Sequence, residues 1–478
     1  MRDQHNPIKN SNSGSSSPAV ISKSIVLFTV AFTLFFTSYM YSSVNIALPD
    51  ISKEFNAHVI DLSWVTLAIL VTSSIFLIPF GRLADIIGLK KMIVYGVILY
   101  ITTNAITALS DSVTMLIVMR AIQGISAAMI VGNTIALISS TFPAGERGKA
   151  LGITSSAVYI GLACGPLISG FLTDQFGWRS IFLINVPAGL IILFLIFWNI
   201  KGEWRGSNGE SLDLIGTALF GIAIVALMYG FSILPETFGW ILILIGTVIM
   251  TGFVFWENRN KSPLIKIDLF RNNRVFIFSN ISALISYAAT YAIIFMMSLY
   301  LQYIKVLGPE TAGLILAVQP AIMALASPLT GRLSDKVEPR ILGSLGMGIT
   351  CICLAILSFL SSSTSIMTII ITLAFIGIGF AMFVPPNTNA VMSSVDPKVY
   401  GVASAIVNTM RNFGQMFSMG VTMMVLALVM GSVVITETNS PQFITSTRIA
   451  FTIFSILCLI GVFTSFARGN IIKKKVVH

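Results

Sequence analysis

Charged residues are scarce in this chain. Lys, Arg, Asp and Glu make up 10% of its 478 residues and 55% are apolar, whereas soluble domains carry about 25% charged residues. Because a water-facing surface needs charge for solubility, this scarcity excludes an ordinary soluble enzyme. About 20 apolar residues cross a bilayer, so the apolar content suffices for roughly a dozen spans. The composition therefore predicts a polytopic membrane protein.

Histidine and cysteine are also rare. The three histidines, His5, His58 and His478, lie in a tail, a loop and the last position, which excludes a histidine-based metal or catalytic site within the membrane. The four cysteines lie inside apolar runs, so we expect buried thiols and neither a disulfide nor a metal site. No zinc-protease, serine-hydrolase or P-loop motif is present. We therefore expect neither an enzyme nor a bound cofactor.

Long uncharged apolar runs, about fourteen in number, occupy most of the chain. Unpaired backbone is too costly in lipid, and the runs lack the alternation of barrel strands, so each is expected to be a spanning helix of an all-α protein. They lie near residues 25–48, 62–80, 92–109, 114–138, 149–172, 180–200, 214–232, 239–256, 275–301, 311–330, 341–360, 364–386, 400–430 and 446–466. The polar residues 1–22 are predicted to form a disordered tail, and residues 468–478 a basic tail.

The basic residues are distributed unevenly between alternate loops. With the N-terminus placed inside, only Lys53, Arg179, Lys305 and Arg448 fall in outer loops, while most of the 29 Lys and Arg fall in inner segments. Basic loops stay on the cytoplasmic side, so both tails are predicted to be cytoplasmic in a multi-pass protein of the cell membrane. The net charge of +10 thus reflects topology in a lipid bilayer, and we expect no nucleic-acid partner.

Two parts of the chain repeat at an offset near 250 residues. The matched residues are Gly81, Leu83 and Asp85 in the first copy and Gly331, Leu333 and Asp335 in the second. Because matched residues fall on the same side of the membrane, the repeat is parallel. It predicts two six-helix bundles, at 23–200 and 274–467, joined by a linker at 201–273 that contains two inserted helices.

A short inner loop, Gly-Arg-Leu-Ala-Asp-Ile-Ile-Gly-Leu-Lys-Lys, occupies residues 81–91. It resembles the signature loop of the major facilitator superfamily, although Ile86 and Leu89 stand where arginines are usual. The resemblance implies the major facilitator fold and a gating role, in which the acid pairs with a base or a helix end across the seam between the halves. The gating residues, including a degenerate second copy, are Gly81, Asp85, Gly88, Lys90, Gly331, Asp335 and Arg340.

An arginine lies inside the fourth span, about seven residues or roughly 10 Å from its start. A charge at that depth is costly unless it faces protein or water, so a functional role is the default. Arg120, Gln123 and Gly124 resemble a further motif of the same superfamily. We expect these three residues to take part in proton coupling.

Small residues recur along one stripe of the fifth span. Gly161, Gly165 and Ser169 follow at i, i+4 and i+8, with Pro166 and Gly170 alongside; such a stripe lets another helix approach closely, and proline bends the helix. The run resembles a signature found mainly in antiporters of the superfamily. Together with Trp-Arg-Ser-Ile-Phe-Leu-Ile-Asn-Val-Pro at residues 178–187, it makes residues 25–466 resemble the fourteen-helix drug/proton antiporters.

The first span departs from that subfamily. Its members usually carry an aspartate five residues before the Asn of an Asn-x-Ala-Leu-Pro motif, and here Met40 takes that place before Asn45. The acids fall in loops or at span ends, which leaves Arg120 and Arg411 as the interior charges. Arg411 lies on a polar stripe that forms either a cavity face or a hydrogen-bonded helix seam. The predicted cavity residues are Met40, Asn45, Asn408, Arg411, Asn412 and Gln415.

These features predict a monomeric secondary transporter that exports small lipophilic compounds by alternating access, in exchange for protons. The proton gradient is the expected energy source. Because the interior charge is positive, substrates are expected to be neutral or anionic. Four tyrosines, Tyr39, Tyr41, Tyr287 and Tyr291, nevertheless offer ring faces to a cation. A facilitator or symporter for a nutrient on the same fold is the alternative.

Overall fold

The computed structural model describes residues 23–200, 202–203, 213–260, 273–334, 336–395, 400–431 and 433–469. These residues form helices joined by short turns, and no strand occurs among them. Within these ranges, fourteen helical segments of 19 to 33 residues are apolar enough to cross a membrane, which confirms the predicted number of spans. The predicted N-terminal tail, most of the C-terminal tail and much of the linker lie outside the described residues.

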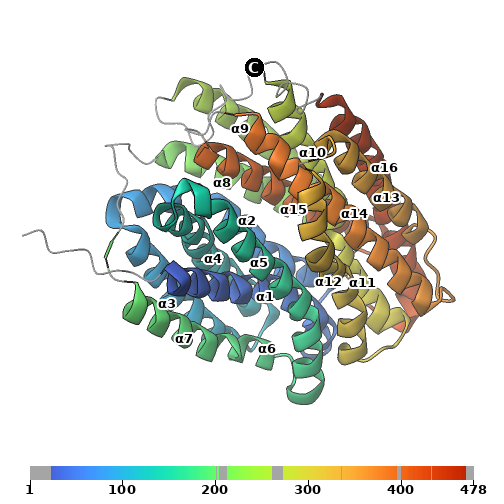
Figure 1. Ribbon diagram of the computed structural model, residues 1–478. Helices are drawn as coiled ribbons and strands as arrows, with labels where there is room; N and C mark the ends of the chain where they lie inside the picture. The colour runs from blue at the N-terminus through green and yellow to red at the C-terminus, as the bar shows by residue number, and fades with distance from the viewer. Residues whose placement is uncertain are drawn as a thin grey trace, which may run out of the picture.

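Seven helices precede the inserted pair. They are α1 (Lys23–Phe55), α2 (Val59–Ile87), α3 (Leu89–Thr107), α4 (Val113–Thr141), α5 (Ala144–Phe176), α6 (Ser180–Leu183) and α7 (Asn185–Asn199). The last two form one span, interrupted at Ile184. Within this N-terminal half α1 packs on α5, α2 on α4, and α3 on α4 and α7. These helices appear blue to green in Figure 1 and gather on one side of the molecule.

The inserted pair and the C-terminal half follow. They comprise α8 (Leu214–Ser232), α9 (Thr237–Arg259), α10 (Arg274–Thr290), α11 (Ala292–Leu299), the π-helix η2 (Tyr300–Ile304), α12 (Pro309–Leu333), α13 (Pro339–Leu357), α14 (Ile366–Ser393), α15 (Tyr400–Val429), the 3-10 helix η4 (Glu437–Asn439) and α16 (Ser440–Ala467). Segments α10, α11 and η2 form one continuous span. Helix α13 packs on α14 and α16, and α10 packs on α15, so these helices form a second bundle beside the first (Figure 1).

Two long helix pairs, together with smaller contacts of α1 with α11 and α12, join the halves. Helix α5 packs along α12, and α2 packs along α15. The inserted helix α8 packs against α2 and α15, and it also packs against α9. Phe220 of α8 meets Phe413 of α15 edge to face, with ring centroids 5.2 Å apart, and a second ring, Phe253 of α9, lies 5.5 Å from it. The inserted pair therefore covers the part of the seam between the halves where α2 packs against α15.

Hydrogen bonds join the halves at one end of the bundle. We call the end that carries Lys23 and Arg468 the terminus end, and the end that carries loops 56–58, 177–179 and 305–308 the far end. At the far end Ser298 Oγ donates to Asn45 O at 2.5 Å, Gln302 Nε2 to Ile46 O at 2.9 Å, and Val59 N to Val433 O at 2.9 Å. These three hydrogen bonds tie the halves together at the far end.

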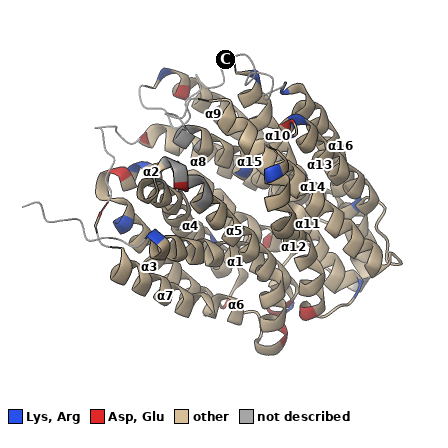
Figure 2. Ribbon diagram, viewed as in Figure 1, with Lys and Arg blue, Asp and Glu red and all other residues tan. Residues whose placement is uncertain are grey.

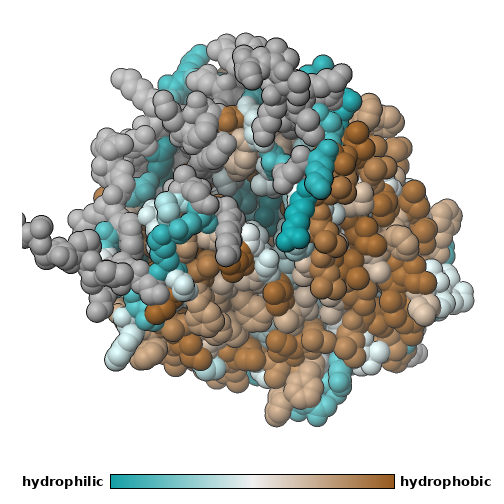
Figure 3. Space-filling view, in the orientation of Figure 1, coloured by the Kyte–Doolittle hydropathy of each residue, from teal (hydrophilic) through white to brown (hydrophobic). Residues whose placement is uncertain are grey.

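The outer surface is apolar, and charge is concentrated toward the helix ends. Large apolar side chains such as Phe194, Trp198 and Leu244 are exposed, and Figure 3 shows brown, hydrophobic residues over much of the visible face. Most of the basic and acidic residues in Figure 2 lie near the ends of helices. Figure 3 also shows a recess with hydrophilic residues near the centre of the view, between the halves. An apolar belt of this kind matches the hydrocarbon layer of a bilayer.

Candidate functional site

Arg120 is fully buried in α4 and is held by three neighbours. Its Nε donates to Val65 O at 3.1 Å, and its Nη1 donates to Gln123 Oε1 at 2.9 Å and to Met40 O at 3.4 Å. These oxygens belong to α2, α4 and α1, so the guanidinium joins three helices of the N-terminal half. Its Nη2 is buried with no hydrogen-bond partner among the described residues. These acceptors are uncharged, so no hydrogen-bond partner among the described residues neutralises the positive charge of Arg120.

Gln123 and Gly124 fix the place of Arg120. Gln123 Nε2 donates to Thr107 Oγ1 at 3.0 Å, which orients the amide so that its oxygen faces Arg120. At Gly124, a Cβ atom would collide with Thr72 Oγ1 and Ile69 O of α2. The motif thus has two roles in the structure. Gln123 positions the arginine side chain, and Gly124 permits close packing of α2 against α4.

Two tyrosines face Arg120 from opposite halves. Tyr41 of α1 and Tyr291, which links α10 to α11, both lie within electrostatic reach of the guanidinium. Both rings are half-buried although each lies in the middle of a span. Arg120 therefore stands beside the seam between the halves.

A second arginine lies on the C-terminal side of the same seam. Arg411 Cζ lies 4.9 Å from the centre of the Tyr287 ring, and Tyr287 meets Phe380 of α14 edge to face at 5.1 Å. Tyr159 of α5 packs on the apolar cluster of Tyr287, Met323 and Phe380, and it lies within electrostatic reach of Arg411. This second arginine and tyrosine group also draws on both halves.

The polar stripe of α15 is half-buried throughout. Asn408, Arg411, Asn412 and Gln415 are each partly exposed within the bundle. Asn412 lines a small pocket together with residues of α2, α8 and α15. The other residues of that pocket are Ser74, Leu77, Phe220, Thr409, Phe413 and Met416. The stripe therefore borders the α2–α15 seam.

Met40 and Asn45 occupy different places from the rest of the predicted cavity. Met40 is buried within the N-terminal half, where its sulfur lies 3.7 Å from Asn104 Nδ2 of α3. Asn45 is buried near the far end, and its Oδ1 accepts from Thr66 Oγ1 at 3.2 Å while its carbonyl accepts from Ser298. Of these two residues, only Asn45 forms a described hydrogen bond with the C-terminal half, and this bond lies at the far end.

The small residues of α5 allow close packing against two helices, α1 and α12. A Cβ atom on Gly161 or Gly165 would collide with α1, at Phe35 O and Ser42 Oγ respectively. A Cβ atom on Gly170 would lie 2.7 Å from Pro309 O of α12. Pro166 also faces α12, because its carbonyl lies against Gly313. Ser169 Oγ donates to Gly165 O at 2.6 Å. The stripe thus holds α5 against its own half on one face and against the other half, near the far end, on the other.

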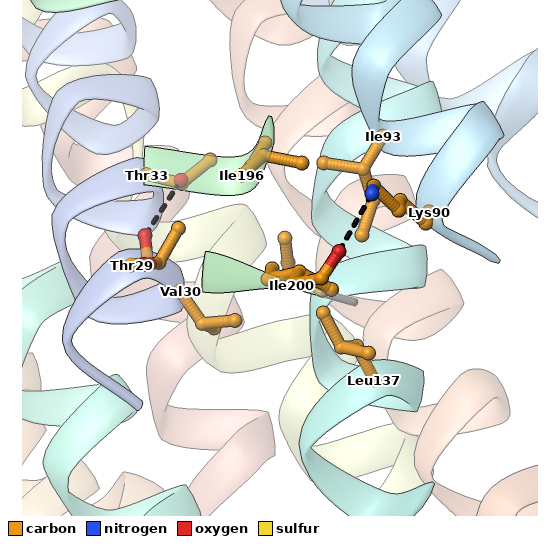
Figure 4. A pocket seen from close by; sticks show the side chains of 9 residues that line it. Thr29, Val30, Thr33, Lys90, Ile93, Leu137, Ile196 and Ile200 are labelled. Atoms are coloured by element: carbon orange, nitrogen blue, oxygen red, sulfur yellow. Dashed lines mark hydrogen bonds between the residues drawn. The ribbon is translucent and has the colours of Figure 1, made fainter. Parts of the chain in front are cut away.

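The signature loop lies at the terminus end. Gly88 has φ +115°, a conformation that favours glycine, and Glu203 occupies the space where its Cβ would be. Lys90 N donates to Glu203 Oε1 at 2.8 Å, and Lys90 Nζ donates to Ile200 O at 2.6 Å. Figure 4 shows the latter bond beside a pocket with room for about one water molecule. Lys90 therefore ties α3 to the end of α7.

Asp85 is half-buried, and the base within its electrostatic reach is Arg82 of its own helix. Gly81 has open space around its Cβ position. In the second copy, a Cβ atom on Gly331 would lie 3.8 Å from Pro385 Cβ, and the guanidinium of Arg340 lies 5.1 Å from the ring of Phe466. Asp335 lies outside the described residues. Pairing of the signature acid across the seam stays a prediction.

The sequence did not indicate the places of Tyr159 and Arg468 in the structure. Tyr159 was not singled out, although it lies two residues before the small-residue stripe of α5. Arg468 was assigned to the basic tail, but it is fully buried: its Nη1 donates to Asn387 Oδ1 at 3.0 Å and its Nε to Ser465 O at 2.9 Å. Burial lowers the pKa of Arg468 to about 10, so it stays cationic at neutral pH.

Comparison with known proteins agrees with this architecture. The family model described as Major Facilitator Superfamily matches residues 30–419, and again 281–476. The chain belongs to the major facilitator superfamily. It is therefore a membrane transporter and not an enzyme. A bacterial homologue of the human lysosomal transporter Spinster shares the fold, with a TM-score of 0.68 at 17% identity over 94% of this chain and 98% of that one.

Curated relatives of this superfamily protein are named for different compounds or for drug resistance. The riboflavin transporter RibZ of Clostridioides difficile is 29% identical over 83% of this chain and 86% of the relative. The multidrug resistance protein Stp of Mycobacterium tuberculosis is 30% identical over 80% of this chain and 72% of the relative. The tetracenomycin C resistance and export protein of Streptomyces glaucescens is 27% identical, over 82% and 73%.

Proposed function

We propose that this transporter exports small lipophilic compounds across the cell membrane in exchange for protons, with both termini in the cytoplasm. The observation that carries the proposal is the contrast between the far end and the centre of the seam: hydrogen bonds and close backbone contacts join the halves at the far end, while polar and aromatic side chains at the centre stay half-buried. With the terminus end on the cytoplasmic side, this is the state that admits a compound from the cytoplasm.

Rocking of the two bundles about this centre is the motion of alternating access. The small residues of α5 allow α5 and α12 to pack closely near the far end, and this packing must be released for the far end to open. The resemblance of this helix to antiporters, and relatives named for multidrug resistance and export, favour export. The proposed transporter is a monomer that uses the proton gradient and no cofactor.

Uptake of a nutrient is the competing function, and the relative named as a riboflavin transporter gives it support. Accumulation assays separate the two. Cells that lack their own efflux pumps, with and without this protein, are loaded with a panel of fluorescent cationic, neutral and anionic compounds. Export predicts lower accumulation in expressing cells, restored by a protonophore. Higher accumulation in expressing cells, or lower accumulation that a protonophore leaves unchanged, contradicts the proposal.

A further inference from the structure

We propose that the centre of the seam binds aromatic compounds that carry an anionic group, with Arg120 holding that group and the tyrosines of both halves holding the ring. This inference rests on the proposed transport function and adds the chemical class of the substrate. It depends on three features: an arginine with an unsatisfied buried donor, an aromatic surface built from both halves, and the placement of acidic groups.

The unsatisfied donor is Nη2 of Arg120. The side chain is fully buried, and its other nitrogens already donate to Val65, Met40 and Gln123. Nη2 has no partner among the described residues. A buried donor on a charged group that makes no hydrogen bond is unfavourable, and a carboxylate is the acceptor that matches a guanidinium best. Arg120 is thus prepared for an anionic acceptor.

Tyr41 and Tyr291 are the tyrosines that an anion held by Arg120 would contact. These rings come from opposite halves, lie within electrostatic reach of the guanidinium, and are both half-buried. Phenol groups can donate hydrogen bonds to a second carboxylate oxygen. Since the rings belong to different halves, a ligand held here touches both bundles, as a site for alternating access requires.

The aromatic surface continues at Arg411. Its guanidinium lies over the face of Tyr287 at 4.9 Å, and Tyr159 and Phe380 complete the group from α5 and α14. Because Arg411 already occupies one face of Tyr287, a cationic ligand at that face must displace it. An aromatic ring, in contrast, can stack on the planar guanidinium or on the neighbouring rings.

Acidic groups are remote from this centre. Each acidic residue in the described helices lies within two turns of a helix end; the nearest to a span's interior is Asp50, five residues before the end of α1. The described part of the seam therefore presents two cations and no carboxylate at mid-span. A low dielectric strengthens repulsion of a cation and attraction of an anion.

The test measures binding and does not require transport. The protein in lipid nanodiscs is titrated with 1-pyrenebutyrate, its methyl ester and a pyrene of equal length ending in trimethylammonium, with empty nanodiscs as background. We expect the acid to bind at least tenfold more tightly than the ester and the cation to bind most weakly. Equal binding of the three, or tightest binding of the cation, overturns the proposal without any variant.

Variants then test whether Arg120 is the residue that binds the anionic group. Arg120→Gln is expected to weaken binding of the acid at least tenfold and binding of the ester less than twofold, while Arg120→Lys restores part of the preference. Arg274→Gln, at an exposed arginine of the terminus end, is the control and should change neither. Equal weakening of acid and ester by Arg120→Gln shows a structural role and contradicts the assignment.

The two proposals fail in different ways. Efflux of neutral compounds without any preference for the acid in nanodiscs overturns the charge selection and leaves export standing. A clear preference for the acid, with no protonophore-sensitive efflux in cells, supports the site and overturns export.

Discussion

Gly170 offers a direct way to disturb the closed far end. An alanine here would place its Cβ 2.7 Å from Pro309 O and 3.2 Å from Glu310 Cα, both backbone atoms of α12. Carbon atoms in good contact lie about 3.5 to 4.0 Å apart, and neither backbone atom can rotate away. The Gly170→Ala variant must therefore move α5 and α12 apart by roughly half an ångström or more.

The clash destabilises only the state in which the far end is closed. Inserting a methyl group into a well-packed contact costs about 1 to 3 kcal/mol. When the contact exists only while the far end is closed, the same free energy shifts the ratio of closed to open forms by about 5- to 150-fold. The folded protein should survive, because the opened form relieves the clash.

Cross-linking measures this shift. The native thiols Cys164, Cys351, Cys353 and Cys458 are replaced, and cysteines are introduced for Asp174 and Gly308, where a Cβ on Gly308 lies 3.6 Å from Asp174 Oδ1. Gly170→Ala should slow cross-linking by a short bifunctional thiol reagent at least fivefold. Gly252→Ala is the matched control, because its Cβ meets no atom within 4 Å. Unchanged cross-linking in a folded Gly170→Ala protein would show that the added methyl group does not separate α5 from α12.

Three further predictions follow from other sites. Gly343→Ala places a Cβ 2.7 Å from Nη2 of the buried Arg468, so it should lower stability by about 1 to 3 kcal/mol in thermal unfolding, whereas Gly348→Ala, in open space, should not. Asp85→Asn should reduce transport about tenfold, or about 1.4 kcal/mol, at matched membrane levels; full transport would make Asp85 an ordinary loop residue. Cysteines replacing Lys266 or Lys474 should resist an impermeant thiol reagent on intact cells while one replacing Lys53 reacts, and the reverse pattern would invert the topology.

The membrane spans were predictable from the sequence because the length and low polarity of an apolar run are enough to identify a spanning helix. The run at 180–200 became the span Ser180–Asn199, and the pair between the halves appeared as α8 and α9. The break at Ile184 was not predicted. Pro187 lacks the N–H that would donate to Leu183 O, but apolar content does not report such a local interruption.

The site was only partly predictable, since its geometry joins distant segments. Depth and charge indicated Arg120 and Arg411, but several of their neighbours lie more than 50 residues away in the sequence, such as Val65 for Arg120. Hydropathy gave no reason to choose Tyr159 over other aromatic residues. Arg468 follows the end of an apolar run and so resembled a tail residue; Asn387 and Gly343 on two other helices create its buried place.

A pH-sensitive dye inside proteoliposomes reports whether the protein exchanges its substrate for protons. Liposomes containing the purified protein are loaded with a neutral substrate found in the accumulation assay and diluted into substrate-free buffer. Outward flow of substrate should draw protons inward and acidify the lumen, and protein-free liposomes should show no change. Alkalinisation of the lumen would show symport, and substrate flow without a pH change would show facilitated diffusion; either result contradicts the account.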